Sequence, residues 1–391
     1  MTALRELDGA DVVRAAEAAL SRASGAAVAI ADVETLSGQE RRNLILRGKT
    51  SGPGGARSVV IKATRAGDYD AAAENAFAAS GLIKEWAATA FLAARAPAGR
   101  HGARLLAGDA AQGILVFEDI GAGLGSLVEP LLEGRPAQAE RALTTYAAAL
   151  GRLHADAAAC TEEHAQALRT SFPTALPPAP QHRARLERLA AAIQARIGGC
   201  VPDDDLAQIA HRLQEPGGWS TLVHGDPCPD NALMSPDGVR LIDFEFAAPG
   251  HALHDGVYWR IGFPTCWCAG RVPDEVAGRV EAAYRTELGR VVADARDSAS
   301  FQRESAFIAA AWLLTSLDWR LDSALADAGQ WGIASMRSRL LWYLEVTIAM
   351  TADAGILPGL QSTARDWLTA LRERWPATES LAFYPAFARA D

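Results

Sequence analysis

The chain has 391 residues, more than a single hydrophobic core usually supports, so we expect two lobes or domains. Hydrophobic residues make up 49% and charged residues 22%, as in globular proteins, and the net charge of −9 argues against a nucleic acid or an anionic membrane as partner. The N-terminus lacks the order of a signal peptide, and the longest apolar run, residues 306–317, is too short to span a bilayer, so we expect a cytoplasmic protein.

The first third of the chain predicts a small lobe of strands with one helix inside it. In chain order the pattern predicts a helix at 10–22, strands at 28–38, 43–47 and 58–64, a glycine-dense connection at 48–57, a helix at 71–96 and a strand at 112–121. The last strand ends at an acidic pair and a glycine, which marks a junction. We therefore expect an N-terminal helix at 1–22 and a β-rich lobe at 23–120.

The rest of the chain reads as mostly helical. From residue 122 onward the apolar spacing is that of helices, with one strand–turn–strand exception near residue 237. A proline-rich stretch at 171–180 predicts a surface loop, and we expect a helical insertion at about 160–205. A β-rich lobe followed by a helical lobe at 121–391 is an α+β fold with two lobes.

The cysteines do not predict a disulfide framework. Their number is odd and they are spread over a long chain: Cys160, Cys200, Cys228, Cys266 and Cys268. The last two form a C-W-C pair, but no second pair stands at the spacing of a structural zinc site. We expect no bound zinc at this pair.

The strand–turn–strand exception places polar side chains on either side of a tight turn. Residues 235–238, Ser-Pro-Asp-Gly, are a strong turn signal, and Asn231 and Asp243 stand at equal distances from its centre. Opposed residues of a hairpin have Cβ atoms about 5 Å apart, and a hard divalent cation takes oxygen ligands at about 2 Å. We therefore expect Asn231 and Asp243 to hold one Mg²⁺.

Asp226 stands five residues before Asn231, on the loop that leads into the hairpin. A carboxylate there can accept the proton of an incoming hydroxyl, which makes Asp226 the candidate catalytic base. The alternative is that these are ordinary turn residues on a surface loop. Apolar runs lead directly into His224 and Asp243, and polar groups at the ends of buried strands need partners, so we favour a site. We expect His224 to orient the loop rather than to catalyse.

These residues resemble a known family. HGDPCPDN at 224–231, followed by LIDFEF at 241–246, resembles the kinase-like small-molecule phosphotransferases, the aminoglycoside phosphotransferase and choline kinase group. Protein kinases have Arg and Gly where this chain has Gly225 and Glu245, which implies a small-molecule acceptor rather than a protein. The resemblance implies a two-lobed protein-kinase-like fold with ATP and Mg²⁺ as cofactors.

The resemblance also implies a set of nucleotide-binding residues. Lys62, which ends the run VVIK, resembles the lysine that contacts the α- and β-phosphates. Glu85 resembles its ion-pair partner, with Glu74 as the alternative because helix registers are uncertain by about 2–4 residues. The junction VFEDIG resembles the hinge, where backbone groups of Glu118 and Ile120 would meet the adenine.

The phosphate loop is the least regular part of the match. The stretch at 36–46 has one glycine, Gly38, although Ser37 and Asn43 stand where the family often has a serine and an asparagine. The Gly-Lys-Thr at 48–50 lacks the earlier glycine and the following helix of a P-loop, so we reject it as a phosphate site.

Further residues in the helical lobe match the family by position. Asp255 resembles the later aspartate that supports the catalytic loop, and we expect His154 to be a buried packing residue. His251 and His254 could suggest metal ligands, but a loop beside the site explains them equally well, and we prefer that interpretation.

The function implied is an ATP-dependent O-phosphotransferase that moves a γ-phosphate to a hydroxyl of an aminoglycoside, amino sugar or amino alcohol. Glu245, Glu275 and Asp318 are acids that could recognise a cationic acceptor, or they are surface acids. The alternatives are a choline or ethanolamine kinase-like enzyme, a catalytically silent pseudokinase, and a metal-dependent hydrolase built from the same carboxylates. A homodimer is compatible with the sequence.

Overall fold

The computed structural model describes residues 4–38, 40–52, 56–71, 77–95, 101–121, 123–159, 161–171, 181–327 and 329–388. The chain divides into two compact units. The first comprises Met1–Leu124, Glu162–Ala179 and Arg240–Ala248, and the second comprises Gly125–Thr161, Pro180–Val239 and Pro249–Asp391. Each unit is described by itself below.

The first unit is built on an antiparallel sheet with the strand order β1-β2-β3-β5-β4. Its strands are β1 (Ala29–Thr35), β2 (Asn43–Ser51), β3 (Arg57–Thr64), β4 (Leu105–Asp109) and β5 (Ile114–Glu118). Its helices are α1 (Gly9–Ser24) and α2 (Phe77–Arg95), and most of α5 (Thr161–Ser171) also belongs to it. The helices and strands predicted at 10–22, 28–38, 43–47, 58–64 and 112–121 are confirmed, whereas β4 was not predicted.

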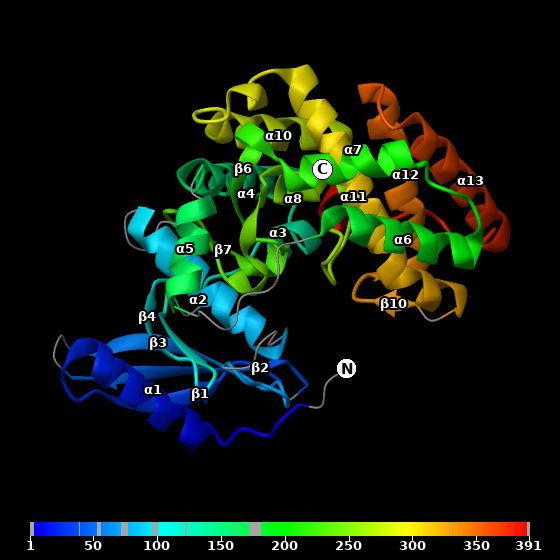
Figure 1. Cartoon of the computed structure of the whole chain (residues 1–391). Helices are drawn as coiled ribbons and strands as arrows, with labels where there is room; N and C mark the ends of the chain where they lie inside the picture. The colour runs from blue at the N-terminus through cyan, green and yellow to red at the C-terminus, as the bar shows by residue number, and fades with distance from the viewer. Residues whose placement is uncertain are drawn as a thin grey trace. The chain divides into compact units, whose positions relative to one another are not determined.

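The alternation of side chains along each strand decides which helix covers which face of the sheet. Ile114 and Val116 of β5 are buried in one apolar cluster with α1, whereas Leu115 and Phe117 are buried in another cluster with Leu82 of α2. Successive residues of a strand point to opposite faces, so α1 and α2 cover opposite faces of the sheet (Figure 1). On β3, the central strand of this sheet, Val59, Ile61 and Ala63 point toward α1, so the residues between them point toward α2.

The second unit is mostly helical. Its longer helices are α4 (Pro136–Asp156), α6 (His182–Ile197), α7 (Asp203–Gln214), α10 (Asp274–Leu288), α11 (Ser298–Leu325), α12 (Met336–Ala354) and α13 (Pro358–Arg374). Short helices are α3 (Val128–Leu132), α8 (Leu253–Gly256), α9 (Tyr258–Ile261) and α14 (Pro385–Ala388). The main core joins α6, α7, α11, α12 and α13 around side chains such as Leu314 and Trp367. None of the helices in the described ranges is long and apolar enough to cross a membrane.

The remaining strands in the described residues form short two-stranded sheets. They pair β6 (Ser220–Val223) with β9 (Ala248–His251), β7 (Ala232–Ser235) with β8 (Gly238–Leu241), and β10 (Gln330–Trp331) with β11 (Ala334–Ser335). The predicted tight turn lies between β7 and β8, where the Asp237 amide donates to Ser235 Oγ at 3.3 Å. The α+β prediction, with a small β-rich part and a larger helical part, is confirmed.

Two predictions differ from the structure. Residues 48–50 lie inside β2 and pair with β3, so the glycine-dense connection is shorter than 48–57. Cys228 and Cys266 form a disulfide, with Cα atoms 5.6 Å apart and a sequence separation of 38. Spacing along the chain does not reveal this pair, because it is the fold that brings the two cysteines together. Glu74, Cys160 and residues 172–180 lie outside the described residues.

Candidate active site

Lys62 occupies the α2 face of the sheet. Its neighbours Ile61 and Ala63 are buried toward α1, so the lysine between them points toward α2 and meets Glu85 there. The Lys62 ammonium lies 2.6 Å from Glu85 Oε2, and both side chains are largely shielded from water, at 13% and 4% exposed. The predicted ion pair between Lys62 and Glu85 is therefore present.

Asp243 also contacts Lys62, within the same unit. It follows β8 and has a left-handed backbone conformation, with φ of 67°, immediately before the short 3₁₀ turn Phe244–Phe246. Its carboxylate accepts a hydrogen bond from Lys62. The Asp243 side chain is 35% exposed, whereas those of Glu85 and Glu245 are 4% and 10% exposed. Of these three carboxylates, Asp243 is the most accessible to a cation from solvent.

Glu245 is already paired with basic and amide groups of its own unit. It forms an ion pair with Arg42, accepts a hydrogen bond from Asn43 Nδ2 at 3.3 Å and lies 3.7 Å from the Lys62 ammonium. These contacts explain its burial better than recognition of a cationic acceptor does. They also place Asn43, a predicted phosphate-loop residue, against this carboxylate.

The cluster around Lys62 has an excess of negative charge. Three carboxylates face two cations, Lys62 and Arg42, which leaves one negative charge in excess when all five groups are ionised. Burial disfavours the ammonium, but Glu85, Asp243 and Glu245 more than compensate and raise the pKa of Lys62 above its usual value. Burial also raises the pKa of Glu85, against the opposing attraction of Lys62. A charged Lys62 and a surplus carboxylate suit both a phosphate and a divalent cation.

The other predicted nucleotide residues lie at strand ends of the first unit. Ser37 Oγ accepts the Ile45 amide at 2.9 Å, and the Gly38 carbonyl accepts the Arg65 guanidinium at 3.2 Å. Glu118 ends β5, where its amide donates to the Arg104 carbonyl at 2.9 Å. Ile120 is half-buried two residues later. The structure thus brings Lys62, Glu85 and Asp243 together. The functional roles of these three residues, and the nucleotide roles of the other four, stay predictions.

Asp119, between Glu118 and Ile120, was not predicted as a site residue. Its carboxylate binds Arg47 Nε at 2.8 Å, Ser58 Oγ at 2.6 Å and the Gly121 amide at 3.1 Å. Partial burial opposes the charge, but these donors lower the pKa of Asp119 below its usual value. The acidic pair at the end of this strand is visible in the sequence, and it could have indicated a charged side chain with partners. Asp119 links the end of β5 to β2 and β3.

The loop at residues 224–231, here called the catalytic loop, belongs to the second unit and is anchored by Asp255. Asp255 accepts the backbone amides of His224 at 2.6 Å and Gly225 at 3.1 Å, and His154 Nε2 lies 3.1 Å from it. Asp255, His154 and His224 are all fully buried. Asp255 therefore contacts the loop that the resemblance expects it to support. His154 is buried as predicted, and it is also hydrogen bonded.

Other side chains fix the backbone of the catalytic loop. Tyr258 donates to the Gly225 carbonyl at 3.2 Å, and Tyr146 donates to the Pro227 carbonyl at 2.6 Å. Gly225 has a φ of 82°, a conformation that glycine adopts without the strain a larger residue would bear. The glycine that replaces the protein-kinase arginine is therefore required by the turn itself.

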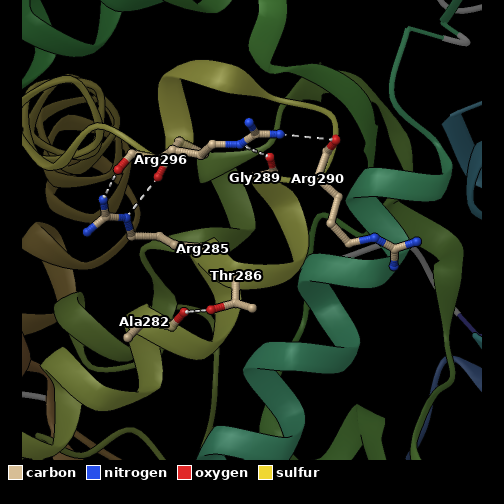
Figure 2. Close-up of a pocket in the computed structure, with 7 residues that line it drawn as sticks. Ala282, Arg285, Thr286, Gly289, Arg290 and Arg296 are labelled. Atoms are coloured by element: carbon tan, nitrogen blue, oxygen red, sulfur yellow. Dashed lines mark hydrogen bonds between the residues drawn. The ribbon is translucent and has the colours of Figure 1, made fainter.

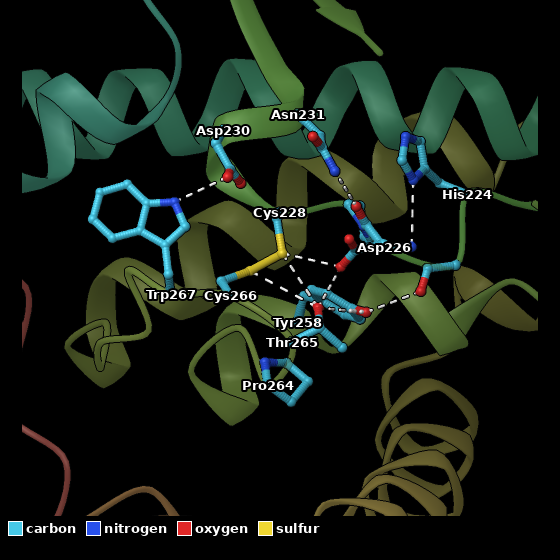
Figure 3. The surroundings of a disulfide bond; sticks show 12 residues. His224, Asp226, Cys228, Asp230, Asn231, Tyr258, Pro264, Thr265, Cys266 and Trp267 are labelled. Carbon is cyan, nitrogen blue, oxygen red and sulfur yellow. Dashed lines mark hydrogen bonds between the residues drawn. A yellow bond between two sulfur atoms is a disulfide. The ribbon is translucent and has the colours of Figure 1, made fainter. Parts of the chain in front are cut away.

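Asp226 is held at its backbone and at its carboxylate (Figure 3). Asn231 Nδ2 donates to the Asp226 carbonyl at 3.0 Å, which closes the catalytic loop. Thr265 Oγ1 donates to Asp226 Oδ1 at 2.5 Å. Neither Thr265 nor the disulfide beside it was predicted. Asn231 belongs to the second unit and Asp243 to the first, and their joint binding of a metal stays a prediction.

The remaining candidates lie in packing contacts, in an ion pair or at the surface. His251 stacks on Trp219 with ring centroids 5.5 Å apart, and His254 packs against Trp312 at 4.6 Å. Within the described ranges, no group of three or more His, Cys, Asp or Glu residues has the arrangement of a metal site. Asp318 forms an ion pair with Arg196 at 3.4 Å. Glu275 is exposed in the first turn of α10.

A surface pocket at the end of α10 is lined by several arginines that contact the chain around it (Figure 2). Arg285 donates to the Ala295 carbonyl at 2.9 Å, and Arg296 donates to the Gly289 carbonyl. Arg290 pairs with Glu287 at 3.3 Å. These guanidinium groups bind backbone carbonyls and a carboxylate around the helix end, which is a structural role.

A model of the phosphotransferase enzyme family matches residues 36–294. The match covers more than half of the chain, and the chain belongs to this family. The prediction of a small-molecule kinase of this family is thereby confirmed. A search of curated proteins returns no match.

Solved structures with a similar fold include three kinases or phosphotransferases. A choline kinase from Cryptosporidium parvum Iowa II is 14% identical, with 86% of this chain and 93% of that chain covered and a TM-score of 0.49. A macrolide 2'-phosphotransferase from Brachybacterium faecium is 15% identical, with 81% and 97% covered and a TM-score of 0.45. An amicoumacin kinase in complex with AMP-PNP and Ca²⁺ is 13% identical, with 81% and 87% covered and a TM-score of 0.45.

Proposed function

We propose that the protein is an ATP-dependent O-phosphotransferase that moves the γ-phosphate of Mg-ATP to a hydroxyl group of a small molecule. The observation that supports this most directly is Asp226, a half-buried carboxylate on a loop that Asp255 anchors and Thr265 contacts. In a chain of the phosphotransferase enzyme family, a carboxylate fixed in this way suits a catalytic base.

The residues around Lys62 suit the nucleotide. Lys62 binds the α- and β-phosphates, and Glu85 keeps its ammonium in place through their 2.6 Å contact. Asp243 and Asn231 are the residues that would hold Mg²⁺, and the ion would neutralise charge on the phosphate oxygens. The surplus carboxylate of the Lys62 cluster and the exposure of Asp243 support this assignment.

Asp226 accepts the proton of the acceptor hydroxyl while the hydroxyl oxygen forms its bond to the γ-phosphorus. The bond between that phosphorus and the oxygen bridging to the β-phosphorus breaks, and its electron pair leaves with ADP. Such a transition state is loose, so catalysis comes mainly from positioning and from stabilising charge. Amino sugars, aminoglycosides and amino alcohols, including choline and ethanolamine, are the acceptor classes to test.

A coupled assay of ADP release, run over a panel of these acceptors, tests the proposal. We expect at least one acceptor to stimulate ADP release, and we expect Asp226→Asn to lower turnover about 10²- to 10⁴-fold because the proton acceptor is lost. The dissociation constant for Mg-ATP should stay within about twofold, since Asp226 is not assigned to the nucleotide. Asp237→Asn, in the exposed turn, is the matched control and should behave as wild type.

The rival functions give different results in the same assay. A pseudokinase binds Mg-ATP, seen as a rise in melting temperature, but releases no ADP with any acceptor. A metal-dependent hydrolase works without ATP and does not respond to Lys62→Met. Unchanged turnover in Asp226→Asn would remove Asp226 as the base.

A further inference from the structure

A short segment between α9 and α10, residues 263–268, contacts the catalytic loop beside its base (Figure 3). We call it the clamp segment. Its Thr265 hydroxyl donates to Asp226 Oδ1 at 2.5 Å and lies 3.2 Å from Cys228 Sγ. A hydrogen bond donated to one carboxylate oxygen fixes the plane of the carboxylate, and so the direction in which it can accept a proton.

Two more contacts join the clamp segment to the catalytic loop. Cys266 forms the disulfide with Cys228, two residues after Asp226. Trp267 Nε1 donates to Asp230 Oδ2 at 2.9 Å. Three successive residues of the clamp segment therefore engage the catalytic loop, and one of these links is covalent.

Buried side chains hold the clamp segment itself in place. The Pro264 carbonyl accepts hydrogen bonds from Arg320 and, at 3.3 Å, from Tyr343. Arg339 donates to the Cys266 carbonyl at 2.7 Å. Arg320 and Arg339 are 5% and 0% exposed, so these hydrogen bonds are shielded from water. The helical core thus supports the segment that supports the base.

We propose that Thr265 is a positioning residue for Asp226, that the Cys228–Cys266 disulfide keeps it in register, and that turnover therefore depends on the oxidation state of this cysteine pair. The inference rests on the function proposed above, since it assumes that Asp226 is the base. Thr265 acts through Asp226.

The redox step is a thiol–disulfide exchange. A dithiol such as dithiothreitol supplies two electrons and two protons and becomes a cyclic disulfide, while the sulfur–sulfur bond breaks and Cys228 and Cys266 become thiols. Cys228 Sγ lies 3.1 Å from Asp226 Oδ1, so its new thiol can donate to the carboxylate. Reduction removes the covalent link between the clamp segment and the catalytic loop and gives the base a second donor, and both effects lower turnover.

The first experiment replaces the hydroxyl with an isosteric methyl. We expect Thr265→Val to lower kcat about 10- to 100-fold, with ADP release from Mg-ATP measured both in water and with the best acceptor of the panel. The KM for ATP should stay within about twofold, and Thr265→Ser should recover most of the loss because it restores the donor. Thr286→Val is the matched control: its hydroxyl bonds the Ala282 carbonyl on α10, and its kcat should not change.

The second experiment alters the disulfide. We expect Cys228→Ala/Cys266→Ala to lower kcat several-fold and to abolish the response to dithiothreitol. As the two thiols appear, counted by maleimide labelling after denaturation, the kcat of wild type should fall at least as far, because the Cys228 thiol adds a donor that alanine lacks. Both sulfurs are buried, so reduction should be slow. The exposed Cys200 gives the control variant Cys200→Ala, which should keep the wild-type response.

The outcomes separate this inference from the proposed function. If Asp226→Asn is inactive while Thr265→Val keeps the wild-type kcat, the positioning role is wrong and the function stands. If reduced wild type keeps its kcat, the redox dependence is wrong. If Asp226→Asn itself keeps the wild-type turnover, the assignment of Asp226 as the base fails, and the positioning role of Thr265 fails with it. Melting temperature and Mg-ATP binding of each variant show that it is folded. If the double cysteine variant does not fold, the Ser/Val comparison at Thr265 still tests the positioning role, and reduction of wild type still tests the redox dependence.

Discussion

Asp255 is a fully buried carboxylate that is stabilised by hydrogen bonds from the loop it anchors. Burial opposes its charge, but hydrogen bonds from His154 and His254 hold the pKa of Asp255 well below its usual value. The His224 amide, 2.6 Å away, adds a further donor. Folding therefore favours the ionised carboxylate.

This lowered pKa predicts the pH dependence of stability. The pKa of Asp255 is lower in the folded than in the unfolded chain, so its contribution is complete above about pH 4 and is lost as the pH falls further. We expect the free energy of unfolding, measured with urea between about pH 3 and pH 7, to decrease less steeply in acid for Asp255→Asn than for wild type. Asp294→Asn, at an exposed aspartate, should retain the wild-type slope. An unchanged slope in Asp255→Asn would contradict this account.

Some residues of the candidate site could be identified from the sequence, and others could not. Asp226, Lys62 and Asp255 follow recognisable motifs, and Glu85 follows from a helix that places it opposite a strand lysine. Thr265 follows no motif, because its partner Asp226 is 39 residues away and only the fold joins them. The cysteines in HGDPCPDN and C-W-C were visible, but their pairing was not.

At the scale of elements, the catalytic loop depends on the left-handed turn at Gly225. Alanine in this conformation costs about 1–2 kcal/mol and would shift the neighbouring Asp226. We expect Gly225→Ala to lose that stability and also to lower kcat by more than about tenfold, measured by urea unfolding and ADP release. Gly355→Ala is the control, since Gly355 has a left-handed conformation, with a φ of 64° and open space around it: it should lose similar stability and keep its kcat.

Strands were predicted where short runs are rich in β-forming residues. In β5 these residues alternate between two covered faces, toward α1 and toward α2, whereas the buried apolar residues of β3 all lie in the cluster with α1. β4 was missed: its sequence LLAGD is short, contains a glycine and ends in a charged residue, so it carries little strand signal of its own. Its pairing with β5 makes it a strand. The conformation of β4 is therefore set by its pairing with β5 and not by its own sequence.

At the scale of the molecule, length predicted two parts, but not which segments form each. Arg240–Ala248 groups with the first unit, where the Leu241 amide donates to the His101 carbonyl at 2.8 Å. This link is between residues far apart in sequence, so no local pattern encodes it. The disulfide lies wholly in the second unit. Cytoplasmic thiols are kept reduced, so the cytoplasmic expectation, which stays a prediction, bears directly on the state of this pair.

The position of the disulfide predicts which unit is destabilised when it is lost. Closing a loop of 38 residues stabilises a fold by about 4 kcal/mol in the chain-entropy model, and both cysteines belong to the second unit. Trp86 is the one of the ten tryptophans in the first unit, so tryptophan fluorescence reports mainly on the second. We expect dithiothreitol to lower the urea midpoint of the fluorescence transition in wild type and not in Cys228→Ala/Cys266→Ala. Cys200→Ala should respond as wild type, and a midpoint that reduction leaves unchanged would show that the disulfide does not stabilise the second unit.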